Sequence, residues 1–299
     1  MALVSFQDMM QEAESGRYAV GYFESWNLES LLAVADAAAN LRSPVILGFS
    51  GIYLPATESG HPERLATYAA LGNELCRQLP VPACLLFNES PYLDWVLQAV
   101  EARFGLVMFT DENLELADQQ EKVRQVVRKA HAAGVAVEGE LLSLPGVSGQ
   151  LAAVPEDLRL TDPQLAKSFV EFTGVDALAV NIGQAHVHGR RQLPLNLSRL
   201  AELRRAVPVP LVLHGATSVE RESLRQAVGL GIRKVNVGSI LKRAFFETLR
   251  NSSRDVAADY SPYDVVGSGH PSDILASGRE AIREAVEELM KLFGSAGKA

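Results

Sequence analysis

Residues 177–215, ALAVNIGQAHVHGRRQLPLNLSRLAELRRAVPVPLVLHG, hold the pattern that decides the fold. An apolar run at 177–183 is followed by an amphipathic helical pattern at 197–207 and by a second apolar run at 211–215. Short continuous apolar runs indicate strands that are buried on both faces, and a helix is the usual connection between parallel strands. The segment therefore predicts a strand, a helix and a second, parallel strand.

The same alternation extends along the whole chain of 299 residues, and no Pro- or Ser-rich linker divides it. Eight strand candidates alternate with helical patterns, which predicts a (β/α)8 TIM barrel rather than an open sheet. We expect one barrel domain over residues 1–299 with a helical C-terminal extension at about 271–299. The strand candidates are residues 18–23, 44–50, 83–89, 106–111, 136–142, 177–183, 211–215 and 234–239; the helical patterns include 27–41, 114–133, 163–173, 197–207 and 220–229.

The composition predicts a soluble protein with a large core. Apolar residues make up 47% of the chain, and the formal net charge of −8 is spread without a basic stripe, which argues against nucleic acid and anionic membranes as partners. No apolar run approaches the roughly 20 residues of a membrane span, and acids stand where a signal peptide would be apolar. Cys76 and Cys84 form no Cys-x-x-Cys motif. We therefore expect a cytoplasmic protein.

Two histidines stand at or just after the carboxyl ends of predicted strands, about one strand–helix unit apart. His214 ends its apolar run, and His186 closely follows the run at 177–183. Imidazole binds zinc and related ions, and the carboxyl ends of barrel strands form the active face, so the pair predicts a divalent metal site. His188 is an alternative ligand, whereas His61, His131 and His270 have no comparable setting.

Two acids and two small-residue loops complete the polar candidates. Glu138 and Glu140 are two positions apart on one predicted strand, so both carboxylates face the same side, where burial without a partner would be costly. The loops at 215–218 and 236–239 each lead from a strand to a helix start, a setting in which backbone N–H groups can surround a phosphate. The sequence thus predicts a metal site beside a phosphate site.

The chain resembles the class II, metal-dependent fructose-bisphosphate and tagatose-bisphosphate aldolases over almost its whole length. The segments that carry the resemblance are YAVGYFESWNLESLLAVADAAANLRSPVIL at 18–47, AHAAGVAVEGEL at 130–141, TDPQLAKSFVEFTGVDALAVNIGQAH at 161–186, PLVLHGATSV at 210–219, GIRKVNV at 231–237 and FGSAGKA at 293–299. The resemblance implies a zinc-dependent (β/α)8 barrel, a homodimer or homotetramer, that splits a ketose phosphate into dihydroxyacetone phosphate and an aldehyde.

The resemblance also implies roles for individual residues. His186 and His214 match two zinc ligands, and Glu140 matches an acid near the metal. Asn236 matches an asparagine that contacts the dihydroxyacetone phosphate half of the substrate. The residues that match the loops around that phosphate are Gly215, Thr217, Gly238 and Ser239.

The chain departs from the family after the third strand, where Asn88-Glu89-Ser90 replaces Asp-His-Gly. The aspartate is the acid/base on the hydroxyl at the cleaved bond, and an amide cannot exchange that proton, so Asn88 cannot replace it. The histidine is a zinc ligand. Because a carboxylate can bind zinc, Glu89 would complete a site with the two histidines. If Glu89 is not a ligand it can be the base, and Glu24, Glu138 and Asp111 are the other carboxylates for that role.

Further departures from the family are at positions that would contact the half of the substrate far from the metal. Glu24 stands where family members often have Asn, residues 110–112 replace Asp-Gly-Ser, and Ser272 stands where an arginine reaches a distal phosphate. An added negative charge and a lost positive one would repel a second phosphate. We expect an aldolase-like carbon–carbon lyase with altered specificity for a phosphorylated ketose; the alternative is a non-catalytic, aldolase-like binding or regulatory subunit.

Overall fold

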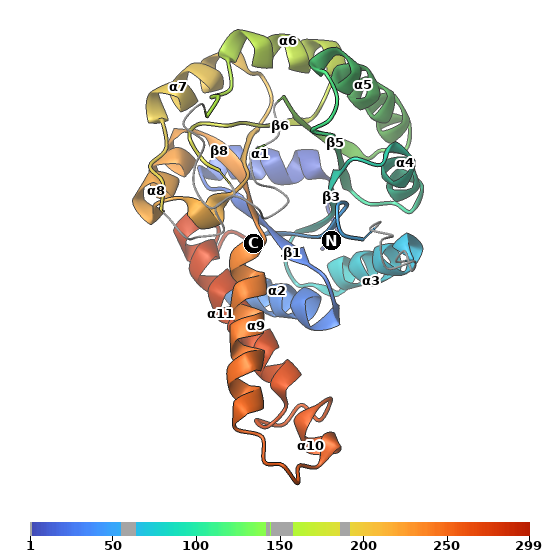
Figure 1. Cartoon of the computed structure of the whole chain (residues 1–299). Helices are drawn as coiled ribbons and strands as arrows, with labels where there is room; N and C mark the ends of the chain where they lie inside the picture. The colour runs from blue at the N-terminus through green and yellow to red at the C-terminus, as the bar shows by residue number, and fades with distance from the viewer. Residues whose placement is uncertain (1, 55–63, 142–143, 145–157, 186–191) are drawn as a thin grey trace.

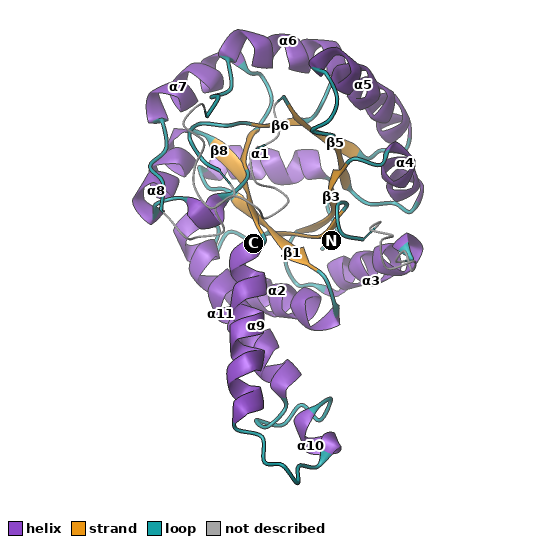
Figure 2. Ribbon diagram, viewed as in Figure 1, coloured by secondary structure: helices purple, strands orange, loops and turns teal. Residues whose placement is uncertain are grey.

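The computed structural model describes residues 2–54, 64–141, 144, 158–185 and 192–299. Eight parallel strands form a closed barrel in sequential order, and helices surround it on the outside (Figures 1 and 2). This confirms the predicted (β/α)8 barrel. The strands are β1 Val20–Ser25, β2 Val45–Ser50, β3 Ala83–Ser90, β4 Leu106–Phe109, β5 Ala136–Glu140, β6 Ala177–Ala179, β7 Leu211–Leu213 and β8 Ile232–Val237.

Each of the first seven strands is followed by a helix, as the alternation predicts. Asn27 caps one of these helices through a capping box with Ser30, and Asp162 caps another through the N–H groups of Gln164 and Leu165, so local side chains fix these helix starts. These helices are α2 Leu28–Leu41, α3 Leu65–Gln78, α4 Leu93–Glu101, α5 Leu116–Ala132, α6 Pro163–Thr173, α7 Leu197–Ala206 and α8 Arg221–Leu230.

An N-terminal helix, α1 Phe6–Gly16, which the strand and helix patterns did not predict, closes one end of the barrel. Its buried face, formed by Phe6, Met9, Met10 and Ala13, packs with the apolar side chains inside the barrel. The helix therefore covers the end opposite the carboxyl ends of the strands, and ligands must enter at the other end.

Small side chains on β6 make room for the two glutamates on β5. Glu138 lies in register with Ala177, and Glu140 with Ala179. Residues in register on neighbouring strands point to the same side of a sheet, so each alanine leaves space beside a carboxylate. Glu138 is fully buried and Glu140 is nearly so, which confirms that both point into the barrel.

A helical arm projects from the barrel at its C-terminal part (Figure 1). It consists of α9 Ser239–Arg254, a short α10 Pro262–Val265 at the tip, and α11 Ile274–Phe293, which returns and packs against α9 and α2. The predicted helix of the C-terminal extension corresponds to α11, but α9 and α10 make the arm longer than expected.

Replacing Asp273 by alanine is expected to lower the free energy of unfolding by about 1–2 kcal/mol, because a cap of the long helix α11 is lost. One carboxylate oxygen accepts the N–H of Leu275 at 2.9 Å, and the other accepts the N–H of Gly269 at 2.9 Å. Urea denaturation measures the loss. Asp273→Asn is the matched control and should retain most of the stability; an alanine variant as stable as the wild type would refute the role of the cap.

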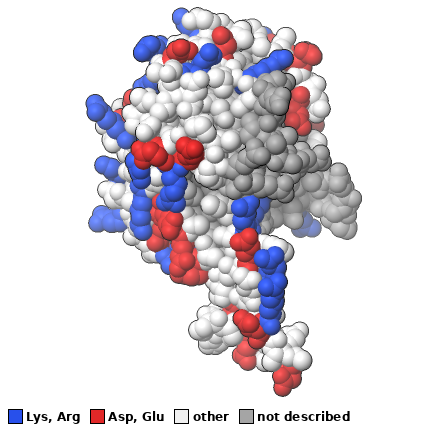
Figure 3. Space-filling model, turned by 60° about the vertical axis from the view of Figure 1, so that its left-hand side comes forward, with Lys and Arg blue, Asp and Glu red and all other residues white. Residues whose placement is uncertain are grey.

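No helix among the described residues is long and apolar enough to cross a membrane. On the face shown in Figure 3, acidic and basic side chains are interspersed over the described part, and no broad patch of one sign covers it. This distribution agrees with the scattered charge of the sequence.

Candidate active site

A pocket of about 240 Å³ opens at the carboxyl end of the barrel. It is lined by the ends of β1, β2, β3, β7 and β8 and by the first turn of α9, so residues from both halves of the chain meet there. The lining residues are Tyr22, Glu24, Ser50, Ile52, Tyr53, Asn88, Glu89, His214, Gly215, Thr217, Ser218, Asn236, Val237, Gly238, Ser239 and Lys242.

His214 is held between two carboxylates. Its Nδ1 lies 3.1 Å from Oε1 of Glu89, and its Nε2 lies 2.7 Å from Oε1 of Glu138. Burial alone would lower the pKa of His214, but the two carboxylates outweigh it and raise this pKa to about 10. In the metal-free protein the ring is therefore a cation at neutral pH, and metal binding there would release a proton.

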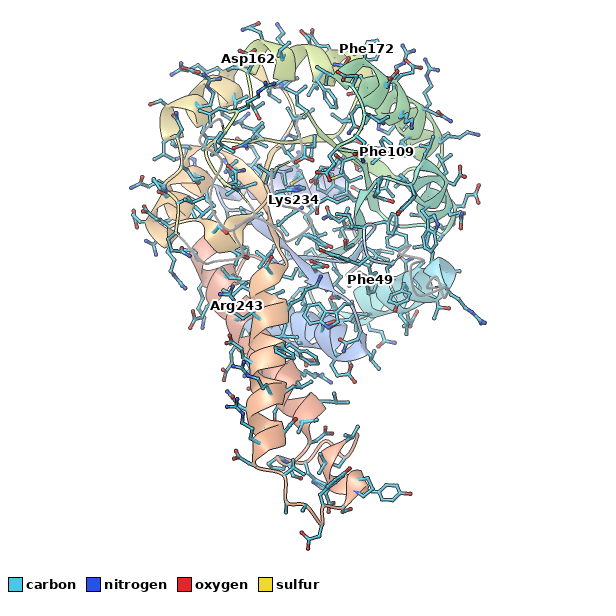
Figure 4. The ribbon with its side chains drawn as sticks, in the orientation of Figure 1. Phe49, Phe109, Asp162, Phe172, Lys234 and Arg243 are labelled. Atoms are coloured by element: carbon cyan, nitrogen blue, oxygen red, sulfur yellow. The ribbon has the colours of Figure 1, made fainter. Side chains whose placement is uncertain are left out.

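A buried ion pair supports Glu138 from the other side. Nζ of Lys234 lies 2.7 Å from Oε2 of Glu138, and both side chains are completely buried. Figure 4 shows Lys234 in the middle of the barrel. Burial would raise the pKa of Glu138, but Lys234 and His214 hold it below its ordinary value. Glu138 is therefore an ionised group with both oxygens engaged, which positions His214 and is unsuited to accept a proton.

Glu89 has a backbone conformation that side chains other than glycine rarely adopt. Its φ is +46°, and the register between β3 and β4 shifts between Phe87 and Ser90. Such a conformation costs on the order of 1 kcal/mol and is typical of functional sites. The irregular end of β3 brings the Glu89 carboxylate to His214, while the amide of Asn88 donates to Oε2 of Glu89 at 2.6 Å.

The residues around His214 and Glu89 fit part of a metal site. Two ligands of a tetrahedral zinc ion are about 3.4 Å apart, given metal–ligand bonds of about 2.1 Å, and the 3.1 Å between Nδ1 of His214 and Oε1 of Glu89 is close to that separation. The contact of Glu138 with the second ring nitrogen is the carboxylate–histidine arrangement that orients metal ligands.

Among the described residues, no group of three or more His, Cys, Asp or Glu side chains is arranged to hold a metal ion. The predicted third donor, His186, and its alternative His188 lie outside the described residues, as does His61.

Glu140 is buried at the carboxyl end of β5 and is not among the residues that line the pocket. Its carboxylate accepts a hydrogen bond from the hydroxyl of Thr110 at 3.2 Å. Burial raises the pKa of Glu140 to about 7. The structure thus places Glu140 inside the barrel, and its role as a metal ligand stays a prediction.

The two predicted phosphate loops line one side of the pocket together. Gly215, which has a φ of +68°, begins the turn that contains Thr217, and Gly238 precedes the 16-residue helix α9 at Ser239. Backbone N–H groups at such a helix start favour an anion. Asn236 lies between these loops and the metal candidates, with its Nδ2 2.8 Å from Nε2 of His214 and 3.3 Å from Oδ1 of Asn88.

Lys242 is a pocket residue that the sequence reasoning missed. Its ammonium lies 2.6 Å from Oε1 of Glu24 and 4.2 Å from the centre of the Tyr53 ring. Burial raises the pKa of Glu24, although Lys242 opposes this effect. The signal that could have found Lys242 is its position one turn into the helix that follows the eighth strand, on the active face of the barrel.

Glu24 also packs directly against Gly238. A Cβ atom on residue 238 would lie 2.2 Å from Oε2 of Glu24, a distance that no real Cβ contact shows. The glutamate therefore occupies space that exists because residue 238 has no side chain.

Other residues singled out from the sequence do not line the pocket. Asp111 accepts the N–H of Asn113 at 3.0 Å, and Ser272 lies on the arm, where its hydroxyl donates to the carbonyl of Asp264. His131 pairs with Asp176 on the outside of the barrel, and His270 is exposed. Asp111 is not among the described residues that line the pocket, and its role as the base stays a prediction.

At the carboxyl end of the barrel, a histidine thus lies between two carboxylates, next to the two loops of Gly215 and Gly238. A family model for the class-II fructose-bisphosphate aldolases matches residues 4–298. The chain therefore belongs to the class-II fructose-bisphosphate aldolase family, as the resemblance indicated.

Solved structures agree with this membership. The YdjI aldolase from Escherichia coli K12 is 27% identical, with a TM-score of 0.79 and coverage of 99% of both chains. A Coccidioides immitis protein provisionally assigned as a fructose-1,6-bisphosphate aldolase is 25% identical over 98% of this chain and 97% of its own, also with a TM-score of 0.79. The fructose-bisphosphate aldolase of Campylobacter jejuni, 20% identical with a TM-score of 0.78 over 100% of this chain and 97% of its own, shares the fold.

Proposed function

We propose that the protein is an aldolase-like carbon–carbon lyase that cleaves a phosphorylated ketose into dihydroxyacetone phosphate and an aldehyde. The observation that carries the proposal is the position of His214 between Glu89 and Glu138, next to the loops of Gly215 and Gly238. Family membership supports the class of reaction. The substrate and the identity of the metal are parts of the proposal.

His214, Glu89 and His186 would hold the divalent cation, for which we propose zinc, with Glu140 near it. A cation at this place would polarise the substrate ketone and stabilise the enediolate that forms when the carbon–carbon bond breaks. The protein's own part is orientation: Glu138 holds the ring of His214, and Lys234 holds Glu138. Gly215, Thr217, Gly238 and Ser239 would bind the phosphate, with Asn236 on the same half of the substrate.

Glu24 is the pocket carboxylate best suited to accept the proton of the substrate hydroxyl. Glu138 has both oxygens engaged, and Glu89 is shared with His214. Burial raises the pKa of Glu24, which makes its carboxylate a better proton acceptor. We therefore assign Glu24 the role of acid/base on the hydroxyl at the cleaved bond, which Asn88 cannot fulfil.

The same residues argue for a substrate with one phosphate. Among the described residues that line the pocket, Lys242 is the single Lys or Arg, and its ammonium is paired with Glu24. Lys242 offsets the negative charge that the sequence suggested would repel a second phosphate, yet the described residues that line the pocket include no further cation to bind one. The ion pair of Glu24 and Lys242 carries no net charge, so it suits an aldehyde half that bears hydroxyl groups better than an aldehyde half that bears a phosphate.

The wild-type protein is expected to cleave fructose 1-phosphate or an epimer with a kcat/KM at least about tenfold above that for the matching 1,6-bisphosphate, which corresponds to about 1.4 kcal/mol. Release of dihydroxyacetone phosphate, measured with a coupled dehydrogenase, tests this. Preference for the bisphosphate would overturn the proposed specificity. Binding of dihydroxyacetone phosphate without cleavage of any ketose phosphate would favour the alternative, a binding or regulatory subunit.

We propose that copies of this chain associate as a homodimer or homotetramer. The described part of the arm exposes large apolar side chains, which a soluble protein usually covers. Tyr263 has an exposed fraction of 85% and Phe246 of 63%, and Tyr260 and Val266 are also more than half exposed. Light scattering of the purified protein measures the assembly directly.

A further inference from the structure

Tyr22 places a hydroxyl group in the barrel that no described residue binds. The side chain is 2% exposed, and its hydroxyl oxygen is buried without a hydrogen-bond partner in the described part of the chain. A buried hydroxyl without a partner costs about 1–3 kcal/mol, so phenylalanine would be the better residue if packing alone mattered.

Tyr22 borders both the pocket and the apolar cluster that α1 contributes to inside the barrel. Tyr22 lines the pocket and lies in register with Asn236 on β8, which contacts Asn88. A Cβ on Gly48 would lie 3.0 Å from the Tyr22 ring. Gly48 is in register with Glu24, which lies two residues closer than Tyr22 to the carboxyl end of β1. The ring of Tyr22 therefore leans toward the pocket.

The surroundings keep the phenol a hydrogen-bond donor. Burial, together with the carboxylates of Glu24, Glu89 and Glu138, holds the pKa of Tyr22 well above its ordinary value. The ammonium of Lys234 lies 5.3 Å from the centre of the ring. Tyr22 therefore offers a proton for a hydrogen bond to an oxygen that gains negative charge.

We propose that Tyr22 is a catalytic residue whose hydroxyl donates a hydrogen bond to the substrate oxygen at the bond that is cleaved. The inference rests on the proposed lyase function. During cleavage the substrate hydroxyl gives its proton to Glu24, its oxygen becomes the aldehyde oxygen, and the carbon–carbon bond breaks with its electron pair passing to the ketone half. Tyr22 stabilises the negative charge on that oxygen and keeps its own proton.

The test compares two reactions of Tyr22→Phe. Cleavage of the ketose 1-phosphate that the wild type cleaves is expected to fall about 100-fold in kcat, the effect of one lost donor to a developing oxyanion. Exchange of the hydroxymethyl hydrogen of dihydroxyacetone phosphate with deuterium from solvent, followed by proton NMR, should be unchanged, because no aldehyde oxygen takes part. The melting temperature should stay equal or rise, since the variant removes an unpaired hydroxyl.

Tyr18→Phe is the matched control: Tyr18 is also buried, with an exposed fraction of 4%, but does not line the pocket, and its variant should cleave and exchange like the wild type. Cleavage by Tyr22→Phe at the wild-type rate would overturn the role of Tyr22 and leave the lyase function standing. An equal loss of exchange would also overturn it. A wild-type protein that neither cleaves nor exchanges would overturn both proposals.

Discussion

Replacing His214 by alanine is expected to remove the bound divalent metal and to lower kcat/KM for the ketose phosphate by about three orders of magnitude, because the loss of a Lewis acid is worth several kcal/mol. Glu89 and Glu138 both contact the ring of His214. Metal content after dialysis against zinc, measured by mass spectrometry, should fall from one ion per chain toward zero. Treatment of the wild type with a chelator should have the same effect on cleavage, and added zinc should reverse it.

His131→Ala is the control for His214→Ala. His131 pairs with an acid, Asp176, at 2.9 Å, as His214 does, but its side chain is 44% exposed on the outside of the barrel. This variant should bind metal and cleave substrate as the wild type does. A His214→Ala protein with a full complement of metal and wild-type cleavage would exclude the proposed metal site.

Lys234→Met is expected to lower the free energy of unfolding by about 3–5 kcal/mol, because it removes the ammonium that pairs with Oε2 of the buried Glu138. Neither side chain of this pair has any exposed area. Urea denaturation followed by circular dichroism measures the loss. The double variant Lys234→Met/Glu138→Gln should recover at least half of it, since the second change removes the carboxylate charge that Lys234 pairs with.

An exposed ion pair provides the comparison for Lys234→Met. Arg77 pairs with Glu74 on α3, with side chains 55% and 57% exposed, so Arg77→Met should change the free energy of unfolding by less than about 1 kcal/mol. If Lys234→Met were as stable as Arg77→Met, the buried ion pair would not stabilise the protein. The claim that this pair positions His214 would then be refuted.

The barrel could be predicted from the sequence because its signal is local. Each strand is a short apolar run, and helix starts such as Asn27 and Asp162 carry their caps beside them. The inward direction of Glu138 and Glu140 follows from the two-residue period of a strand. The end of β6 was less predictable: side-chain hydrogen bonds of Asn181 and Gln184 to nearby N–H groups replace the strand pairing expected up to residue 183.

The partners of the candidate site could not be predicted, because they meet only when the barrel closes. Glu24 and Lys242 are 218 positions apart, and His214 and Glu89 are 125 apart. Sequence reasoning treated Glu24 as a lone negative charge for this reason. Tyr22 escaped notice because an aromatic residue in a strand is ordinarily part of the core; only the missing partner of its hydroxyl distinguishes it.

The contact between Glu24 and Gly238 constrains how these two positions can vary during evolution. A side chain at 238 would displace the carboxylate of Glu24 from its position beside Lys242, so a glutamate at 24 that keeps this ion pair favours glycine at 238. The restriction runs one way, because glycine at 238 also leaves room for the asparagine that family members often have at 24. A relative with glutamate at 24 should therefore keep glycine at 238, whereas glycine at 238 alone does not identify this pocket.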